Sequence, residues 1–578
     1  MSFIWLRTTT CAAIVAAAVV VISASRLVAA LAVGKPLPPD IVVTDISGHQ
    51  KPLVSLLTGD ARARLALIRV HAAWCGTCQW HAGWSGALLT QVGTRVRLID
   101  VVIADEDNQP AMPETIRAWA AREGMGGAAI VVAAAADPFR ALFPAPAPLP
   151  RVVIVDARDG TVLGLLANPD PETLVALVRQ HLAGAGRAPA STTAAAPAAG
   201  RIDGLFTRDQ WALIAGMRWS SAPLPDPTNR VADDPKAAAL GETLFSDATL
   251  SFGGRSCAAC HNPSLLFTNG KDVAAEGAGP GSRNVPTILA ASHARWLLWD
   301  GRVDSLWAQA TMPIEDAEEM GSSRLFLAHA VHQRHRPAYE ALFGPLPALE
   351  DEHRFPVEGK PGDPRWERMN ADDREAVTRI LANVGKAIAA FERRVTTTVQ
   401  PNALDRYAAG DREALTRPEK EGLAAFFEAG CAQCHYGPRL SDDAFHALRF
   451  PTGRYDGRAD RGRIDGIPRL IADEFSRAGR FSDAPLSPHR PHPSPSAIGA
   501  FRTPSLRGVA STMPYGHGGG FAGLALVIEA HRKGGLPLNN RYAVGETEPW
   551  AQDFDPRLTE KMLPFLQVLR MDVAPRSQ

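Results

Sequence analysis

Cysteine is scarce in this chain, and neither sign of charge prevails. The 578 residues include seven cysteines, and 61 lysines and arginines balance 61 aspartates and glutamates. A net charge of zero gives no electrostatic reason to expect a nucleic-acid partner. Six of the cysteines fall into three Cys-x-x-Cys pairs, so none is left over for a framework of structural disulfides. The length allows several domains.

Long apolar runs are also rare, and the N-terminus carries the main one. Arg7 precedes the apolar residues 11–24, and small residues with an Ala-x-Ala pattern follow. A short positive region, an apolar core and such a site predict a secretory signal peptide over residues 1–32. The run is short for a bilayer span and is followed by Arg26, so an uncleaved membrane anchor is the alternative. We expect export to a bacterial periplasm.

Two of the cysteine pairs are followed directly by histidine. The residues are Cys257, Cys260 and His261 in the first, and Cys431, Cys434 and His435 in the second. Cys-x-x-Cys-His is the spacing of c-type haem attachment, in which both thiols join the porphyrin and the histidine binds the iron. Two copies predict two covalently bound haem c groups. Two zinc half-sites are the alternative, but structural zinc needs four ligands and the adjacent histidines would be unexplained.

A low-complexity segment divides the chain. Residues 184–200 are rich in alanine, glycine and proline and show no periodicity, which predicts a flexible linker. It separates residues 33–183 from two haem-binding domains, which we place at 201–400 and 401–573. The sequence therefore predicts a multidomain protein.

The first half alternates between strand and helix patterns. Strands are predicted at residues 65–70, 96–104, 151–156 and 161–167, and helices at 113–123 and 171–182. This alternation predicts an α/β domain, with a hairpin between its last two strands.

The third cysteine pair, Cys75 and Cys78, follows the first of these strands. A cysteine pair after a strand in a βαβ context indicates a thioredoxin-like redox motif. The run Trp74-Cys75-Gly76-Thr77-Cys78 resembles the thioredoxin superfamily, and Pro150 matches its cis-proline position. By this resemblance, Cys75 is a low-pKa thiol at a helix N-terminus and Cys78 is its buried resolving partner.

Two alternatives to dithiol chemistry stay open for this pair. The fold could be thioredoxin-like with a chemically inert pair of cysteines. The pair could also hold copper, since His71 and His81 are near it in the sequence.

The second half is mainly helical in pattern. Helical runs at residues 237–245 and 418–427 precede the two haem motifs, and residues 371–394 form one long helical pattern between them. We expect two mainly α-helical, cytochrome c-type haem domains.

Short motifs surround the haem motifs in a fixed order. They are Leu240-Gly241, Arg283-Asn284, Trp299-Asp300-Gly301-Arg302, Glu319-Met320-Gly321, Tyr436-Gly437-Pro438 and Thr503-Pro504-Ser505-Leu506-Arg507. With them, nearly all of residues 220–570 resembles the bacterial di-haem cytochrome c peroxidases, a family that includes the MauG-type protein-oxidising enzymes.

The resemblance assigns the reaction with peroxide to the first haem, with His261 as its proximal ligand. Glu319 falls at the family's acid/base glutamate, Gln309 at its polar companion, and Trp299 between the haems as an electron path. The acidic run alone would make Glu319 a solvated charge, and plain core packing would also explain Trp299. Glu276 stands where many relatives carry an inhibitory histidine, so we expect an open or water-ligated first iron.

The resemblance makes the second haem the site of electron entry, with His435 as the proximal ligand. Fourteen residues after His517, where the family has a distal methionine or tyrosine, this chain has His531. We predict bis-histidine ligation, with a lower potential than histidine and methionine would give. The alternative is an ordinary histidine on a helix surface.

The family also holds a calcium ion between its haem domains. The matching positions are the side chain of Asn284 and the carbonyls of Thr512 and Pro514, which are the oxygen ligands that calcium prefers.

These features predict an exported di-haem peroxidase, an oxidoreductase that reduces hydrogen peroxide with electrons from a small cytochrome c or cupredoxin. The alternative is a MauG-like oxidase, which uses peroxide-derived high-valent haem to oxidise a protein substrate or quinone precursor. A third reading is a non-catalytic di-haem electron carrier. Gln309 and Glu319 argue against it, because a carrier does not need a distal acid.

Overall fold

The computed structural model describes most of the chain outside the N-terminus. The described residues are 31–57, 62–72, 78, 88, 91–93, 95–105, 111–122, 129–134, 151–167, 171–182, 201–272, 283–451, 459–485, 491, 493–547 and 553–574. Outside them lie residues 1–30 of the predicted signal peptide, the predicted linker, Cys75, His81, Pro150 and Glu276.

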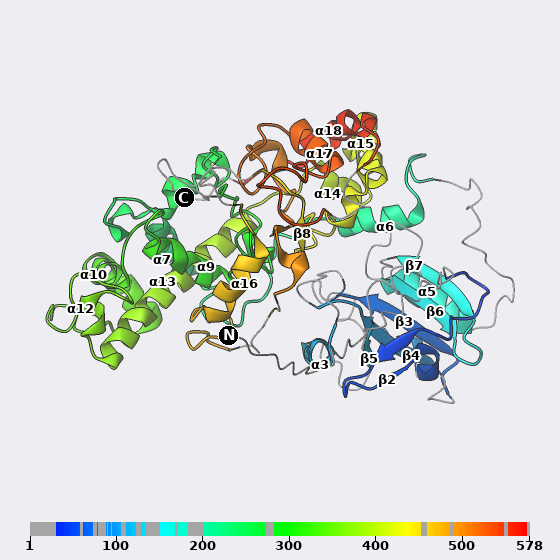
Figure 1. The fold of residues 1–578 in the computed structure, drawn as a ribbon, viewed down its shortest axis with the longest axis horizontal. Helices are drawn as coiled ribbons and strands as arrows, with labels where there is room; N and C mark the ends of the chain where they lie inside the picture. The colour runs from blue at the N-terminus through cyan, green and yellow to red at the C-terminus, as the bar shows by residue number, and fades with distance from the viewer. Residues whose placement is uncertain are drawn as a thin grey trace, which may run out of the picture.

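A seven-stranded sheet forms the core of the first half, and Figure 1 shows it in blue to cyan. Its strands are β1 (Val42–Thr44), β2 (Gln50–Pro52), β3 (Leu65–His71), β4 (Val96–Val102), β5 (Ala129–Ala133), β6 (Arg151–Asp156) and β7 (Val162–Ala167). The spatial order is β2-β1-β5-β4-β3-β6-β7. β3, β4 and β5 run parallel, whereas β6 is antiparallel to β3 and β7 to β6. The predicted strands are confirmed within one or two residues.

The sheet has an apolar layer on each face. Strand β3 is buried at every position, which explains why its sequence is a nearly continuous apolar run. On one face, Leu65 and Leu67 pack with helix α5 (Pro171–Leu182). On the other, Ile68 and Val70 share a cluster with Trp119 of helix α3 (Pro113–Arg122). The order β4-β3-β6-β7 followed by α5 is the thioredoxin-like arrangement that the sequence predicted.

The second half is helical and has two separate cores. Its helices are α6 (Arg208–Gly216), α7 (Pro235–Ser246), α8 (Cys257–Cys260), α9 (Leu306–Glu315), α10 (Arg324–Arg334), α11 (Arg336–Phe343), α12 (Pro364–Glu367), α13 (Ala371–Thr397), α14 (Ala403–Ala408), α15 (Arg417–Glu428), α16 (Arg463–Ala472), α17 (Leu524–Arg532) and α18 (Arg557–Val568). A two-stranded sheet joins β8 (Phe445–Ala447) to β9 (Ala500–Arg502). Within the described residues, no helix is both long enough and apolar enough to cross a membrane.

The first helical core is built around α13, which packs against α7, α9 and α10. The Asn370 side chain caps its N-terminus by accepting from the Asp373 amide. Helix α7 crosses α13 so closely that a Cβ on Gly241 would lie 1.9 Å from the Ala387 carbonyl oxygen. This close approach is the physical reason for glycine in the Leu240-Gly241 motif.

The second helical core pairs α15 with α18, where Phe426 and Phe565 meet edge to face with ring centroids 5.3 Å apart. A buried ion pair between Arg507 and Asp405, 2.8 Å long, ties the Thr503–Arg507 motif to α14. Each haem motif thus lies in its own helical unit, as the sequence predicted.

The two halves of the chain are not separate in the structure. Tyr436 and Ala444, both buried, belong to the apolar cluster that includes Cys78 and Trp119 of the sheet domain. Figure 1 shows the sheet next to α6, which contacts β7. Tyr436 and Ala444 lie in the loop that follows the second haem motif.

Candidate haem and peroxide site

One continuous cavity of about 320 Å³ reaches both Cys-x-x-Cys-His motifs. His261 lines it at the first motif, Cys431, Cys434 and His435 line it at the second, and Trp299 also lines it. None of the four cysteines of the two motifs is disulfide-bonded. Thiols and imidazoles at a largely apolar cavity are the groups that covalent haem needs, so these residues fit haem c.

The two proximal histidines are oriented in the same way. Nδ1 of His261 lies 3.0 Å from the Phe267 carbonyl oxygen, and Nδ1 of His435 lies 2.9 Å from that of Leu440. A carbonyl only accepts, so Nδ1 carries the proton and Nε2 keeps its lone pair. Burial lowers the pKa of His261, and it lowers the pKa of His435 to about 4. Both imidazoles are therefore neutral, as iron ligands must be.

His531 on helix α17 has its Nδ1 bound to a backbone carbonyl in the same way. Its Nδ1 lies 2.8 Å from the Val527 carbonyl oxygen, which leaves Nε2 available, and burial lowers its pKa. It lines the cavity with His435, and the ring of Phe450 meets it edge-on at 4.8 Å. The location disfavours an ordinary surface histidine. Second-iron ligation by His531 remains a prediction.

His446 and Asp442 form a supporting pair at the second motif. Nε2 of His446 lies 2.9 Å from an Asp442 carboxylate oxygen and 3.7 Å from Cys434 Sγ. These three groups are close enough to hold a metal ion. Because Cys434 belongs to the haem-attachment motif, we interpret the pair as support for haem attachment.

Trp299 is held in the cavity wall by contacts with the backbone. Its Nε1 donates to the Asn284 carbonyl at 2.8 Å, and the Asn284 amide donates to the His517 carbonyl at 2.9 Å. The buried His517 ring stacks on Phe501 with centroids 3.7 Å apart. The indole thus has a fixed orientation in the cavity wall, consistent with either a bridging or a packing role.

The motif after Trp299 is built around a buried aspartate. Asp300 accepts ion pairs from Arg283 at 2.7 Å and Arg302 at 3.0 Å. Burial opposes ionisation of Asp300, but the two arginines win and lower its pKa to about 2. Gly301 has φ of 63°, and a Cβ there would lie 2.3 Å from the Phe445 ring. These contacts explain the Asp-Gly-Arg part of the motif.

The predicted calcium positions come together in the same cavity wall. Asn284, Thr512 and Pro514 all line the cavity. The Asn284 side-chain nitrogen donates to the Lys271 carbonyl at 2.9 Å, so its amide oxygen is the remaining donor atom for a cation. An amide oxygen with backbone carbonyls is a donor set that fits calcium.

Gln309 and Glu319 belong to α9 and the loop after it. Gln309 lines the cavity. Within the acidic run, Asp316 and Glu318 are exposed but Glu319 is half-buried, which disfavours a freely solvated Glu319. Burial, and next the charge of Asp316, raise the pKa of Glu319. Burial and then the charge of Glu319 raise the pKa of Cys260, which puts this carboxyl near the first haem motif.

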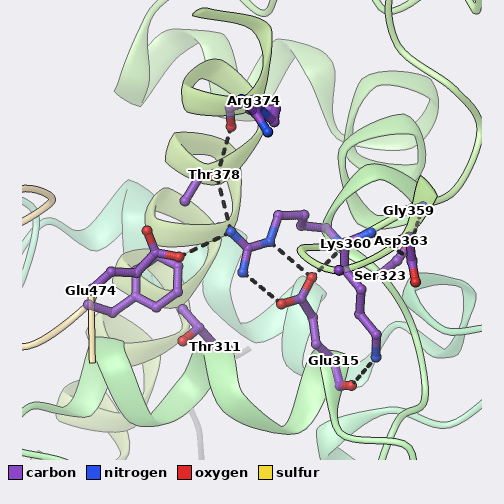
Figure 2. Close-up of polar contacts among 12 residues, drawn as sticks. Thr311, Glu315, Ser323, Gly359, Lys360, Asp363, Arg374, Thr378 and Glu474 are labelled. Atoms are coloured by element: carbon purple, nitrogen blue, oxygen red, sulfur yellow. Dashed lines mark hydrogen bonds and ion pairs between the residues drawn. The ribbon is translucent and has the colours of Figure 1, made fainter. Parts of the chain in front are cut away.

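A buried arginine at the start of α10 closes the loop that carries Glu319. Arg324 forms an ion pair of 2.8 Å with Glu315, the last residue of α9. Glu315, Thr378 and Glu474, labelled in Figure 2, surround the guanidinium, with Thr378 and Glu474 each 3.1 Å away. Lys360 also donates to the Glu315 carbonyl at 2.7 Å. The two ends of the Glu319 loop are therefore fixed to each other and to α13.

Glu392 of α13 is a cavity residue that the sequence reading missed. It lines the cavity, is buried, and has a carboxylate oxygen without a hydrogen-bond partner among the described residues. Burial raises its pKa to about 8. The signal was its helical phase, because Ile388 and Val395 on the same face are buried core residues.

The described part of the thioredoxin-like site is fully buried. Cys78 has no exposed surface and takes part in a disulfide. His71 lies with its Nε2 3.4 Å from Asp100 Oδ1, and Asp100 also pairs with Arg69 at 2.7 Å. A disulfide at Cys78 agrees with dithiol chemistry. The pairing of His71 with Asp100 gives that histidine a role other than copper binding.

The second half of the chain is similar in sequence to known di-haem proteins. The family model described as di-haem cytochrome c peroxidase matches residues 235–413. The methylamine utilization protein MauG of Methylorubrum extorquens is 31% identical over 345 residues, covering 59% of this chain and 80% of MauG. The cytochrome-c peroxidase IdrP1 of a Pseudomonas species is 30% identical over 328 residues, covering 54% and 77%. The diheme peroxidase BthA of Burkholderia thailandensis is a structural neighbour, with a TM-score of 0.42, 22% identity, and coverage of 60% and 88%.

Proposed function

Because this chain belongs to the di-haem cytochrome c peroxidase and MauG family, we propose that it reduces hydrogen peroxide to water with electrons from a small redox protein. The observation that supports this function is the half-buried carboxyl of Glu319, with its raised pKa, near the first haem motif. A carboxylic acid in that position can move protons during peroxide cleavage.

Haem, when bound, would supply an iron that reacts with peroxide and relays electrons. His261 would hold that iron through Nε2, because its Nδ1 proton is committed to Phe267. Glu319 can take a proton from hydrogen peroxide and return it to the leaving oxygen. Gln309 lies in the cavity wall, where its amide can orient the peroxide. The ion pair between Arg324 and Glu315 keeps the Glu319 loop in place during this proton transfer.

The second haem motif supplies electrons in this scheme. His435 and His531 both line the cavity with Nδ1 engaged by a carbonyl, which leaves Nε2 available, and Trp299 lies in the same cavity wall. We propose a small cytochrome c or cupredoxin as the donor and calcium bound by Asn284, Thr512 and Pro514.

MauG-like oxidation of a protein or quinone precursor is the second candidate. It is favoured by His531, which stands where the peroxidases of the family carry methionine. The similarity of 31% to MauG supports the same option.

Steady-state turnover distinguishes the two candidates. We expect the holoprotein to consume hydrogen peroxide with reduced cytochrome c as donor and without prior reduction of the enzyme. Absence of turnover with every small donor protein, combined with a lasting spectral change on peroxide addition, would favour the oxidase.

We propose the periplasm as the place of action. The N-terminal apolar run and two haem-attachment motifs support export, and residues 1–30 lie outside the described structure. Fractionation of cells that express the full chain tests this, with the haem-containing protein expected in the periplasmic fraction or, if the signal is retained, in the membrane fraction.

A further inference from the structure

The loop after the second haem motif connects the haem centre to the thioredoxin-like domain. Tyr436 comes directly after His435 and is 4% exposed. It shares a buried cluster with Cys78, which is fully buried and disulfide-bonded. The first haem motif has no such connection, since the cluster packed around Cys257 contains no residue of the sheet domain among those described.

A second residue of the same loop repeats this contact. Ala444 is fully buried in the sheet-domain cluster, and its amide donates to Asp442, the partner of His446 beside Cys434. The loop is also tied back to the motif, because the Asp442 amide donates to the Cys434 carbonyl at 2.8 Å. Within the described structure, the only residues of the haem half in this cluster thus both lie shortly after the second haem motif.

We propose that the dithiol containing Cys78 is an internal electron donor to the second haem, which makes the chain a dithiol-dependent peroxidase. This inference rests on the proposed peroxidase function. Cys78 and Tyr436 are both buried in one apolar cluster, and Tyr436 directly follows His435 in the chain. The donor of electrons is then part of the same polypeptide.

The reaction balances without any further reactant. The dithiol loses two electrons and two protons and forms one S–S bond. Hydrogen peroxide takes up both electrons and both protons, its O–O bond breaks, and two water molecules leave. A reduced dithiol therefore supplies the whole requirement of one peroxide, whereas a one-electron donor protein must dock twice. Re-reduction of the disulfide at Cys78 requires an external dithiol reductant.

A single-turnover experiment on the full-length holoprotein tests the proposal. The disulfide is reduced, the reductant is removed under anaerobic conditions, and one equivalent of hydrogen peroxide is added to the ferric protein without an external donor. The reaction is quenched with an alkylating agent, and mass spectrometry measures the alkylated fraction of Cys78. We expect one disulfide to form per peroxide.

Glu319→Gln with both haems retained controls for direct attack of peroxide on the thiols. We expect Cys78 to be oxidised at least about tenfold more slowly in this variant, because the acid/base group is lost. Equal rates of Cys78 oxidation in the variant and the parent would overturn the proposal. If the two rates are equal but the parent protein turns over peroxide normally with reduced cytochrome c, only this inference fails. If the parent protein shows no such turnover either, the peroxidase function itself fails.

Variants of Tyr436 test the path. Tyr436→Phe preserves the ring and its packing, and we expect Cys78 oxidation within about twofold of the parent. Tyr436→Leu removes the ring, and we expect a decrease of at least about fivefold, with the haem absorption and circular dichroism of the parent. Unchanged Cys78 oxidation in Tyr436→Leu would contradict a path through this residue.

Discussion

The two haem-attachment motifs share one proximal design but have unlike surroundings. In each, a histidine Nδ1 donates to a backbone carbonyl a few residues later, Phe267 in the first and Leu440 in the second. Beyond this, the first is near two carboxyl groups with a raised pKa, Glu319 and Glu392. The second is near another imidazole, His531, and its carboxyl neighbour Asp442 has a lowered pKa beside His446. The pentapeptide thus attaches the haem, and side chains far away in sequence decide whether its site handles protons or electrons.

The largest expected effect concerns Glu319, the group that we propose moves protons at the first haem motif. Glu319→Gln should lower kcat for peroxide by about 100-fold or more while both haems stay attached, because proton transfer is lost but cofactor binding is not. Peroxide consumption with reduced cytochrome c measures the effect. Glu318→Gln, an exposed neighbour in the same run, is the matched control and should keep the activity of the parent.

The next largest effect concerns the ion pair that fixes the loop carrying Glu319. Arg324→Met should cost about 3 kcal/mol of unfolding free energy, because Glu315 would lose its buried partner. Denaturant unfolding of the holoprotein measures this cost, and kcat should fall with it because the Glu319 loop loosens. Arg334→Met, at the exposed end of the same helix, should leave both quantities unchanged.

A smaller effect is expected on the reduction potential at the second haem motif, where we propose that electrons enter. His531→Met should raise the reduction potential of the second haem by on the order of 0.1 V, because a thioether stabilises ferric iron less than imidazole does. Spectroelectrochemistry measures the potential, and electron paramagnetic resonance should show the loss of a low-spin bis-imidazole signal. His353→Met at an exposed position is the control. Identical spectra in His531→Met and the parent would remove His531 from the ligand set.

The smallest effect lies outside both sites. Burial raises the pKa of Asp473 to about 7, so the folded state binds this proton more tightly than the unfolded chain does. Its unfavourable contribution is absent at low pH, grows as pH rises above its ordinary value, and is complete above about pH 7. Asp473→Asn should therefore raise the melting temperature by a few degrees at about pH 8 and hardly at all near pH 4. Asp465→Asn, at an exposed position of the preceding helix α16, should show no such dependence on pH.

Much of the fold follows from local patterns in the sequence. Strand β3 and helix α13 stand out because their apolar positions match the periods of a buried strand and of a helix. Helix α13 extends to Thr397, three residues beyond the predicted end, because its last turn stays packed against the first core. The haem motifs were readable because covalent attachment fixes the spacing of cysteines and histidine.

The rest depends on long-range contacts that no local pattern encodes. The helical phase of Glu392 places it on the buried face of α13, but only the packing of that helix puts this face at the cavity. Arg324 finds Glu474 across 150 positions of sequence. Likewise, Tyr436 was readable as part of a motif, but its place in the core of a different domain was not.

The shared cluster has a practical consequence for dissecting the chain. A haem half produced without the sheet domain would leave the Tyr436 ring and the Ala444 methyl uncovered, beside the second haem attachment. Such a fragment would expose an apolar patch that promotes association, and solvent would reach the surroundings of the second haem motif more easily. Truncated material would thus misreport both solubility and midpoint potential.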